Sequence, residues 1–207
     1  LSYEAAAMLD LAAHCPDPSQ AATYQSRGDF LIPIVKAWCT ESSIELTSMA
    51  VQVHGGMGYV EDTGAAQHFR DARITTIYEG TTAIQANDFL GRKLARDKGS
   101  EAKKLLSEVQ ETARQLAGHE HKDCQAMGAV LLKASAVLQE SVDASLEALQ
   151  TQQSVGAFMG SVPLVMLSGF VLGGWMMGRS ALVAYNKKDQ APFYERKLES
   201  ASFYCQQ

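Results

Sequence analysis

A carboxylate at a break between two expected helices could take part in proton transfer. Glu79 follows an apolar stretch and stands between Tyr78 and Gly80. A carboxylate held there with little water would have its ionised form disfavoured, which suits a general base for a weakly acidic C–H proton. Glu79 could instead favour the dipole of the following helix from its N-terminus. Local physics alone favours this simpler role.

Three neighbouring glycines could bring backbone amides close to a ligand. Gly55, Gly56 and Gly58 occur together, and amides at a helix end can hold a phosphate or pyrophosphate. A dinucleotide-binding loop of the Rossmann type is disfavoured, because that motif follows a strand and here a long helix is expected before it. A plain turn between helices explains the glycines as well from this stretch alone.

Two other groups of polar residues are given simpler interpretations. His119, His121 and Cys124 could begin a metal site, but no second group of ligands follows at a useful spacing, so no metal is expected. Glu41 and Glu45 share a helix face without a basic partner at helical spacing, and we expect both to be solvated.

Charge and cysteine content limit the class of protein. The net charge of −5 and the lack of a basic run argue against nucleic acid as a partner. The four cysteines are widely spaced without a CxxC pair, which favours free thiols and a cytoplasmic protein. Because the first residue is Leu and the opening residues already have a helical pattern, we expect a fragment of a longer chain.

Apolar residues recur at helical spacing along almost the whole sequence, which predicts an all-α fold. The side chains of Asp62 or Thr63, and of Thr81 and Thr82, are candidates for helix N-caps. The turn at 97–100 is the candidate boundary between two modules, 1–98 and 99–207. The expected helices lie at about 2–13, 20–54, 64–73, 83–96, 101–117, 123–152, 161–186 and 191–204, and the last four would form an antiparallel bundle.

Residues 154–178 carry no charge and could suggest a membrane segment. Six glycines and Pro163 lower the hydrophobicity of this stretch, and charged helices are expected on either side. We therefore expect a helix buried in a bundle. A non-catalytic assembly module or a membrane-associated module remains the alternative.

Three blocks in this order, AVQVHGGMGYVED, RDARITTIYEGTTAIQ and DFLGRKLARD, resemble the C-terminal helical domain of the flavin-dependent acyl-CoA dehydrogenases. The resemblance covers residues 1–98 strongly. Residues 99–207 look like the extra helical module of the longer bacterial branch, which includes methylthiopropionyl-CoA dehydrogenase-like enzymes. The resemblance implies an acyl-CoA dehydrogenase C-terminal-type helical bundle followed by a second antiparallel helical module.

The resemblance also implies roles for individual residues. Glu79 matches the catalytic base, which removes the α-proton of an acyl-CoA while the β-hydrogen leaves as hydride to FAD. Its backbone N–H would help to polarise the thioester carbonyl. Gly80 matches a substrate-binding position, and Thr81 a position that contacts the diphosphate region of the flavin. Ala83 departs from the family pattern, in which many relatives carry a polar residue, so no side-chain contact with the cofactor is assigned there.

The family's remaining contacts imply an oligomer. In the family, one segment contacts the adenosine diphosphate part of the FAD that is bound mainly by a neighbouring subunit. The matching residues here are Gln52, Val53, His54, Gly55 and Gly56. A site shared in this way implies a homodimer or a dimer of dimers. By resemblance, the electron acceptor is electron-transferring flavoprotein. An acyl-CoA oxidase, which has the same fold and type of base, is the other alternative.

Overall fold

The computed structural model describes residues 1–151 and 154–206, and every regular element within them is a helix. This confirms the all-α prediction. In chain order the elements are α1 Ser2–His14, α2 Pro18–Val53, α3 Gly56–Tyr59, the 3-10 helix η1 Glu61–Thr63, α4 Ala65–Ile74, α5 Thr82–Asp88, the π-helix η2 Phe89–Leu94, α6 Ser100–Ala117, α7 Lys122–Gln150, α8 Ser154–Met159, α9 Ser161–Tyr185, the 3-10 helix η3 Lys188–Gln190 and α10 Pro192–Gln206.

The expected helices agree with the structure to within a few residues at most ends. The short helices α3, η1 and η3 lie between the expected ones, and three further differences occur. The helix expected at 83–96 is α5 followed by the wider turns of η2. The stretch before 161, expected to be a linker, contains the short helix α8. The helix expected at 123–152 ends at Gln150, and its expected last residue, 152, lies outside the described residues.

The N-cap expected for α4 was wrong. Asp62 and Thr63 belong to η1, and the cap position is taken by Gly64, which has a φ of 75° and no side chain to donate or accept a hydrogen bond. Thr63 Oγ1 accepts only a long hydrogen bond of 3.4 Å from the N–H of Ala65. The chain therefore enters α4 through a left-handed glycine, a conformation that glycine adopts at little steric cost.

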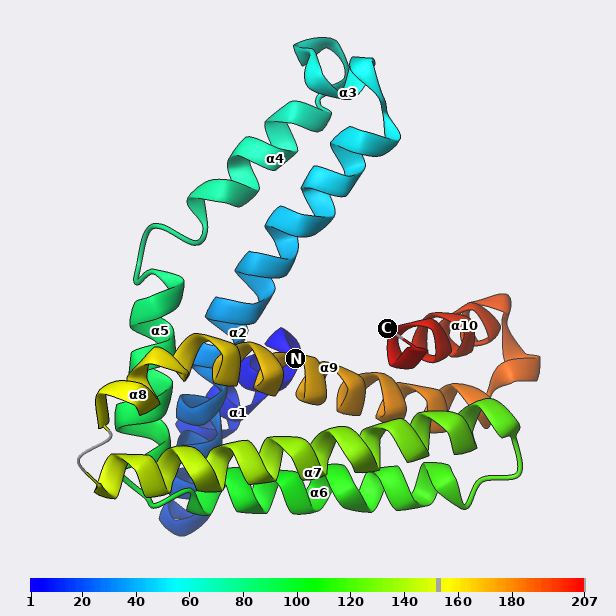
Figure 1. Cartoon of the computed structure of the whole chain (residues 1–207). Helices are drawn as coiled ribbons and strands as arrows, with labels where there is room; N and C mark the ends of the chain where they lie inside the picture. Colours follow the sequence, from blue (N-terminus) through cyan, green and yellow to red (C-terminus); the bar gives the residue numbers. More distant parts are fainter. Residues whose placement is uncertain (152–153, 207) are drawn as a thin grey trace.

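The elements form an elongated base from which an arm projects (Figure 1). Helices α6 and α7 lie side by side, α9 packs against both, and α10 folds back along α9. The C-terminal half of α2 leaves the base and, with α3 and α4, forms the arm, here residues 40–74 (Figure 1). After α4, helix α5 returns the chain to the base and packs against α2 and α9.

The turn expected at 97–100 is present and tightly capped. Lys98 and Gly99 both have a positive φ, of 56° and 74°. The carboxylate of Asp97 accepts hydrogen bonds from the N–H groups of Gly99 and Glu101, at 2.9 and 2.7 Å. These bonds satisfy amide donors at the start of α6 that have no partner within the helix.

One continuous core joins the residues on either side of this turn. Its members come mainly from α2, η2, α6, α7 and α9, and include Leu31, Ile34, Phe89, Leu90, Leu105, Val109, Val165 and Leu172, all nearly or fully buried. The chain before and after 97–100 therefore shares one apolar interior, and the division into modules 1–98 and 99–207 stays a prediction.

The uncharged stretch expected in the interior, residues 154–178, contributes α8 and most of α9, which also contains Arg179. Among the described residues, α9 is the helix that is long and apolar enough to cross a membrane by length and composition, and 61% of its most apolar window is buried inside the protein. It contacts α2, α5, α6, α7 and α10. This burial favours the interpretation of α9 as a core helix.

The glycines of α9 allow a close approach by two aromatic side chains. A Cβ placed on Gly169 would lie 2.2 Å from Cγ of Trp38, and one on Gly173 would lie 2.3 Å from Oη of Tyr204. Tyr204 Oη donates a hydrogen bond of 3.0 Å to the carbonyl of Phe170. The glycine content that lowers the hydrophobicity of α9 therefore makes room for side chains of α2 and α10.

Replacing Gly169 by Ala is expected to destabilise the protein by about 1–3 kcal/mol, because Trp38 or the helix backbone must move to admit the methyl group. In a chain of this size that corresponds to a fall in Tm of roughly 3–10 °C, measurable by circular dichroism. The matched control is Gly156→Ala in α8, where an added Cβ meets no atom within 4 Å. A Gly169→Ala variant as stable as this control would contradict the packing described.

Candidate functional site

The break at Glu79 forms an elbow, here residues 75–81, between α4 and α5 (Figure 1). Glu79 has a φ of 54° and Gly80 a φ of 94°. A left-handed conformation costs a non-glycine residue about 1–2 kcal/mol, and such strain is found preferentially at functional sites. The φ of Gly80 favours glycine, and a Cβ there would require the amide of Gln85 to move, because its Nε2 lies 2.6 Å away.

The residues after the elbow fix its exit into α5. Thr81 is the N-cap of α5, and its Oγ1 accepts a hydrogen bond of 3.4 Å from the N–H of Ile84. This confirms the cap predicted for Thr81. Gln85 reaches back from the first turn of α5 and donates from Nε2 to the carbonyl of Glu79 at 3.3 Å.

Helix α2 contacts the elbow at its entrance and its exit. Lys36 Nζ donates a hydrogen bond to the carbonyl of Thr75 and lies 4.8 Å from the centre of the Tyr78 ring. Further along α2, Glu41 Oε1 accepts a hydrogen bond of 2.5 Å from Oγ1 of Thr82.

The expectation that Glu41 is merely solvated was therefore wrong, because it is half-buried against α5, while Glu45 is exposed. The partners Glu41 and Thr82 lie 41 residues apart, so no local spacing in the sequence could have identified this contact.

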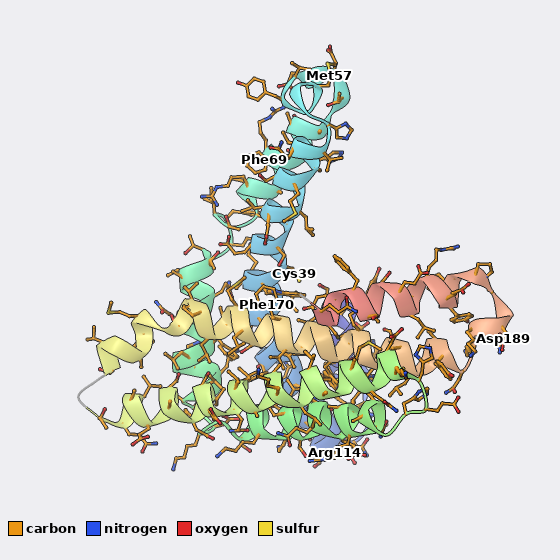
Figure 2. The ribbon with its side chains drawn as sticks, turned by 45° about the vertical axis from the view of Figure 1, so that its right-hand side comes forward. Cys39, Met57, Phe69, Arg114, Phe170 and Asp189 are labelled. Atoms are coloured by element: carbon orange, nitrogen blue, oxygen red, sulfur yellow. The ribbon has the colours of Figure 1, made fainter. Side chains whose placement is uncertain are left out.

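The side chain of Glu79 is exposed, so this chain does not by itself create the dry environment that suits a base of this kind. An open groove of about 580 Å³ lies between the arm and α9, but no residue of the elbow lines it. Phe69 of α4 and Phe170 of α9 line opposite sides of it (Figure 2). The surface facing Glu79 would have to come from outside residues 1–207.

The other predicted contact residues form the tip segment, here residues 52–56, at the far end of the arm. All five are exposed, and Val53 has 86% of its surface accessible. Gly55 has a φ of 60°, and a Cβ on either Gly55 or Gly56 would meet no atom within 4 Å. Met57, the next residue, marks this end of the arm in Figure 2. The backbone there is open to approach from outside the chain.

The structure does not bring the two groups of predicted residues together. Glu79, Gly80 and Thr81 lie at the elbow, whereas the tip segment lies at the opposite end of α4 (Figure 1). With ten residues, α4 spans about 15 Å. One chain therefore offers two separate surfaces, and their contacts with substrate and cofactor stay predictions.

Both surfaces are open to the FAD contacts that the resemblance implies. The open backbone at Gly55 and Gly56 permits the close approach that a diphosphate or adenosine group needs. At the elbow, Thr81 Oγ1 accepts one hydrogen bond within the chain and keeps its own hydrogen to donate. Nothing in either surface encloses a flavin, so the described residues could supply only part of its binding site.

The side chains of His119 and His121, which could begin a metal site, make other contacts in the structure. His121 is the N-cap of α7 and accepts a hydrogen bond of 3.3 Å from the N–H of Asp123. The rings of His119 and His121 lie 4.4 and 5.3 Å from the ring of Tyr185. In residues 1–151 and 154–206, no group of three or more His, Cys, Asp or Glu side chains has the arrangement of a metal site.

The cysteines are free thiols, as the sequence predicts. Burial raises the pKa of the Cys124 thiol, and the charge of Asp123 adds to this effect. Burial likewise raises the pKa of the Cys205 thiol. Both groups are therefore protonated at neutral pH, which makes them poor nucleophiles.

Comparison with known proteins finds a family model that matches each part of the chain. Residues 1–94 match the family described as "Acyl-CoA dehydrogenase, C-terminal domain", and residues 105–207 match the one described as "Acetyl-CoA dehydrogenase C-terminal like". The elbow and the tip segment both fall within the first match. Almost the whole chain is therefore covered by two matches of the same kind.

Individual relatives agree with this result. The chain is 44% identical over 202 residues to 3-methylmercaptopropionyl-CoA dehydrogenase of Ruegeria pomeroyi, covering 96% of this chain and 34% of the relative. It is 34% identical over 195 residues to a broad-specificity linear acyl-CoA dehydrogenase of Mycobacterium tuberculosis, covering 86% of this chain and 30% of that protein.

A shorter match includes the human mitochondrial short-chain specific acyl-CoA dehydrogenase, at 48% identity over 52 residues, 25% of this chain and 13% of the relative. The chain spans about a third of the length of the first two relatives. With matches over residues 1–94 and 105–207, this helical chain belongs to the acyl-CoA dehydrogenase family and corresponds to the C-terminal part of its members.

Proposed function

We propose that the full-length protein containing this chain is an FAD-dependent acyl-CoA dehydrogenase that oxidises an acyl-CoA thioester to the 2,3-enoyl-CoA. The observation that carries the proposal is the elbow, where the left-handed backbone at Glu79 and Gly80 leaves the carboxylate of Glu79 exposed. This elbow lies within the residues that match the family's C-terminal domain.

In this reaction Glu79 accepts the α-proton of the acyl group. The electron pair of the broken C–H bond forms the double bond between the α- and β-carbons, and the β-hydrogen departs with its own electron pair as hydride. FAD, when bound, supplies the acceptor for that hydride. The N–H of Glu79 polarises the thioester carbonyl, and Gly80 lies beside the substrate. The rest of the protein covers the exposed Glu79 and excludes water.

The same proposal assigns the cofactor contacts to two flavins. Thr81 contacts the diphosphate region of one FAD, while the tip segment contacts the adenosine diphosphate part of an FAD bound mainly by a neighbouring subunit. The length of α4 between elbow and tip supports this division. Exposed apolar residues along the arm support its burial against another subunit or the rest of the chain, among them Leu46, Met49, Val53, Tyr59 and Ile74.

The protein would then act as a homodimer or dimer of dimers in the cytoplasm, and electron-transferring flavoprotein would reoxidise it. The shared site makes assembly a requirement for activity. Residues 1–98 would form the domain that carries the base, and residues 99–207 an additional helical module.

The 207-residue chain alone is expected to be inactive, because the surface that should cover Glu79 is missing from it. The test compares this chain with the full-length protein for formation of enoyl-CoA from a panel of acyl-CoA thioesters with an artificial electron acceptor. We expect turnover only from the full-length protein. Turnover by the isolated chain would contradict the requirement for the missing part, and a full-length protein that carries no flavin would contradict the proposed function.

A further inference from the structure

The entrance of the elbow is tied to α2 through Lys36. The Lys36 ammonium group donates a hydrogen bond to the carbonyl of Thr75, the first residue after α4, and it lies 4.8 Å from the centre of the Tyr78 ring. Lys36 and Thr75 are both half-buried. A charged donor that is partly removed from water makes a stronger hydrogen bond than an exposed one, and the ring face adds an attraction to the same cation.

The exit of the elbow is tied to the same helix through Glu41. Its Oε1 accepts a hydrogen bond of 2.5 Å from Oγ1 of Thr82, the first residue of α5, and both side chains are half-buried. Lys36 and Glu41 lie five residues apart on α2, so their backbones are separated by about 7.5 Å along the helix axis. The elbow is therefore attached to one rigid element at two points.

Between these points lie the two residues with positive φ, Glu79 and Gly80. A strained backbone persists only where its surroundings leave it no relaxed alternative. Next to the elbow, Gln85 of α5 helps to hold this backbone, because its Nε2 donates a hydrogen bond of 3.3 Å to the carbonyl of Glu79. The two attachments to α2 limit how far the elbow can lengthen or rotate to release the strain of Glu79.

We infer that Lys36 and Glu41 are positioning residues, which act through the backbone of the elbow to set the direction of the Glu79 carboxylate. This inference rests on the proposed role of Glu79 as the base. Proton transfer requires the base within hydrogen-bond reach of the α-carbon, and a displacement of about 1 Å can slow a reaction about 100-fold. The two residues therefore contribute to the rate of α-proton removal and not to the affinity for acyl-CoA.

The test uses the full-length protein with bound FAD and three variants. Lys36→Met removes the ammonium group and keeps the apolar stem, whereas Lys36→Arg retains a charged donor. Thr82→Val removes the hydroxyl that donates a hydrogen bond to Glu41 and keeps the shape of the side chain. Lys133→Met, at an exposed position on α7, is the matched control.

Anaerobic stopped-flow measurements give the rate of flavin reduction at saturating acyl-CoA and, separately, the apparent Kd. We expect Lys36→Met and Thr82→Val to lower the limiting rate about 10-fold or more, with the Kd within about twofold of wild type. The α-deuterium isotope effect on flavin reduction should increase. Lys36→Arg should recover part of the rate, and amide hydrogen exchange across residues 75–82 should be faster in the two impaired variants.

A purely structural role gives a different result. It would lower Tm and FAD content but leave the limiting rate of the FAD-bound fraction at the wild-type value, and that outcome would overturn the inference. Glu79→Gln is measured in parallel. If Glu79→Gln is inactive while Lys36→Met and Thr82→Val reduce flavin normally, only the positioning role is overturned. If Glu79→Gln itself reduces flavin normally, the assignment of the base is overturned as well.

Discussion

In the full-length protein, Glu79→Gln is expected to keep FAD bound but to lower the rate of flavin reduction by acyl-CoA about 10²- to 10⁴-fold. Glutamine has nearly the same size and the same backbone preferences, so it should tolerate the φ of 54° as well as glutamate does. The backbone N–H that polarises the thioester is unchanged. What the variant lacks is a group able to accept the α-proton.

The measurement is the anaerobic loss of the oxidised flavin absorption band after mixing with acyl-CoA. The matched control is Glu147→Gln, which makes the same change at an exposed position on α7, and it should reduce flavin at the wild-type rate. Near-normal bleaching in Glu79→Gln would show that another group removes the proton.

Arg27→Met is expected to cause a large loss of stability, although Arg27 lies outside the site. Arg27 joins α2 to α6, with Nε donating to Glu101 at 2.5 Å and two further nitrogens donating to Glu108 at 3.1 and 2.6 Å. The side chains of Arg27 and Glu101 are only 13% and 5% exposed. Burial lowers the pKa of Arg27, but the hydrogen bonds to Glu108 and Glu101 outweigh this and raise it above its ordinary value. The cation is therefore fully charged at any working pH.

Removing this cation leaves the buried carboxylate of Glu101 with the more distant ammonium of Lys104, 3.9 Å away. Breaking a buried pair from one side costs about 3–5 kcal/mol, and because Glu108 is half-exposed we expect about 3 kcal/mol. For a chain of this size the corresponding fall in Tm is about 6–12 °C. The measurement is thermal unfolding followed by circular dichroism.

Two further variants test the origin of that loss. Arg70→Met breaks an exposed pair with Glu61 and should not change Tm measurably. Glu101→Leu added to Arg27→Met should recover part of the lost stability, because it removes the uncompensated buried charge. A double variant no more stable than Arg27→Met would show that lost packing, and not the buried carboxylate, causes the effect.

The parts of the fold that local chemistry determines could be predicted from the sequence. Apolar spacing located the long helices, and the hydroxyl of Thr81 marked the start of α5. The break between Tyr78 and Gly80 was predicted as well. Its left-handed conformation at Glu79 was not, because glutamate has no intrinsic preference for positive φ and the surrounding tertiary contacts impose it.

The contacts that hold the elbow and the core depend on residues far apart in sequence. Glu41 has no partner at helical spacing within α2, and its partner Thr82 is brought to it only when α5 folds back. Similarly, the sequence shows only that the glycines of α9 lower its hydrophobicity. Their packing role depends on Trp38 of α2, which fills the space beside Gly169 in the folded chain. Both contacts join residues that are distant in the sequence, so rules based on local periodicity and helix capping could not predict them.

The most direct test of the proposed function is an anaerobic titration of the full-length protein with saturated acyl-CoA thioesters of different chain lengths. We predict that at least one thioester bleaches the oxidised flavin band in proportion to the amount added and yields one equivalent of the 2,3-enoyl-CoA per flavin reduced. A full-length protein whose flavin is unaffected by every thioester, or one without flavin, would contradict the proposal.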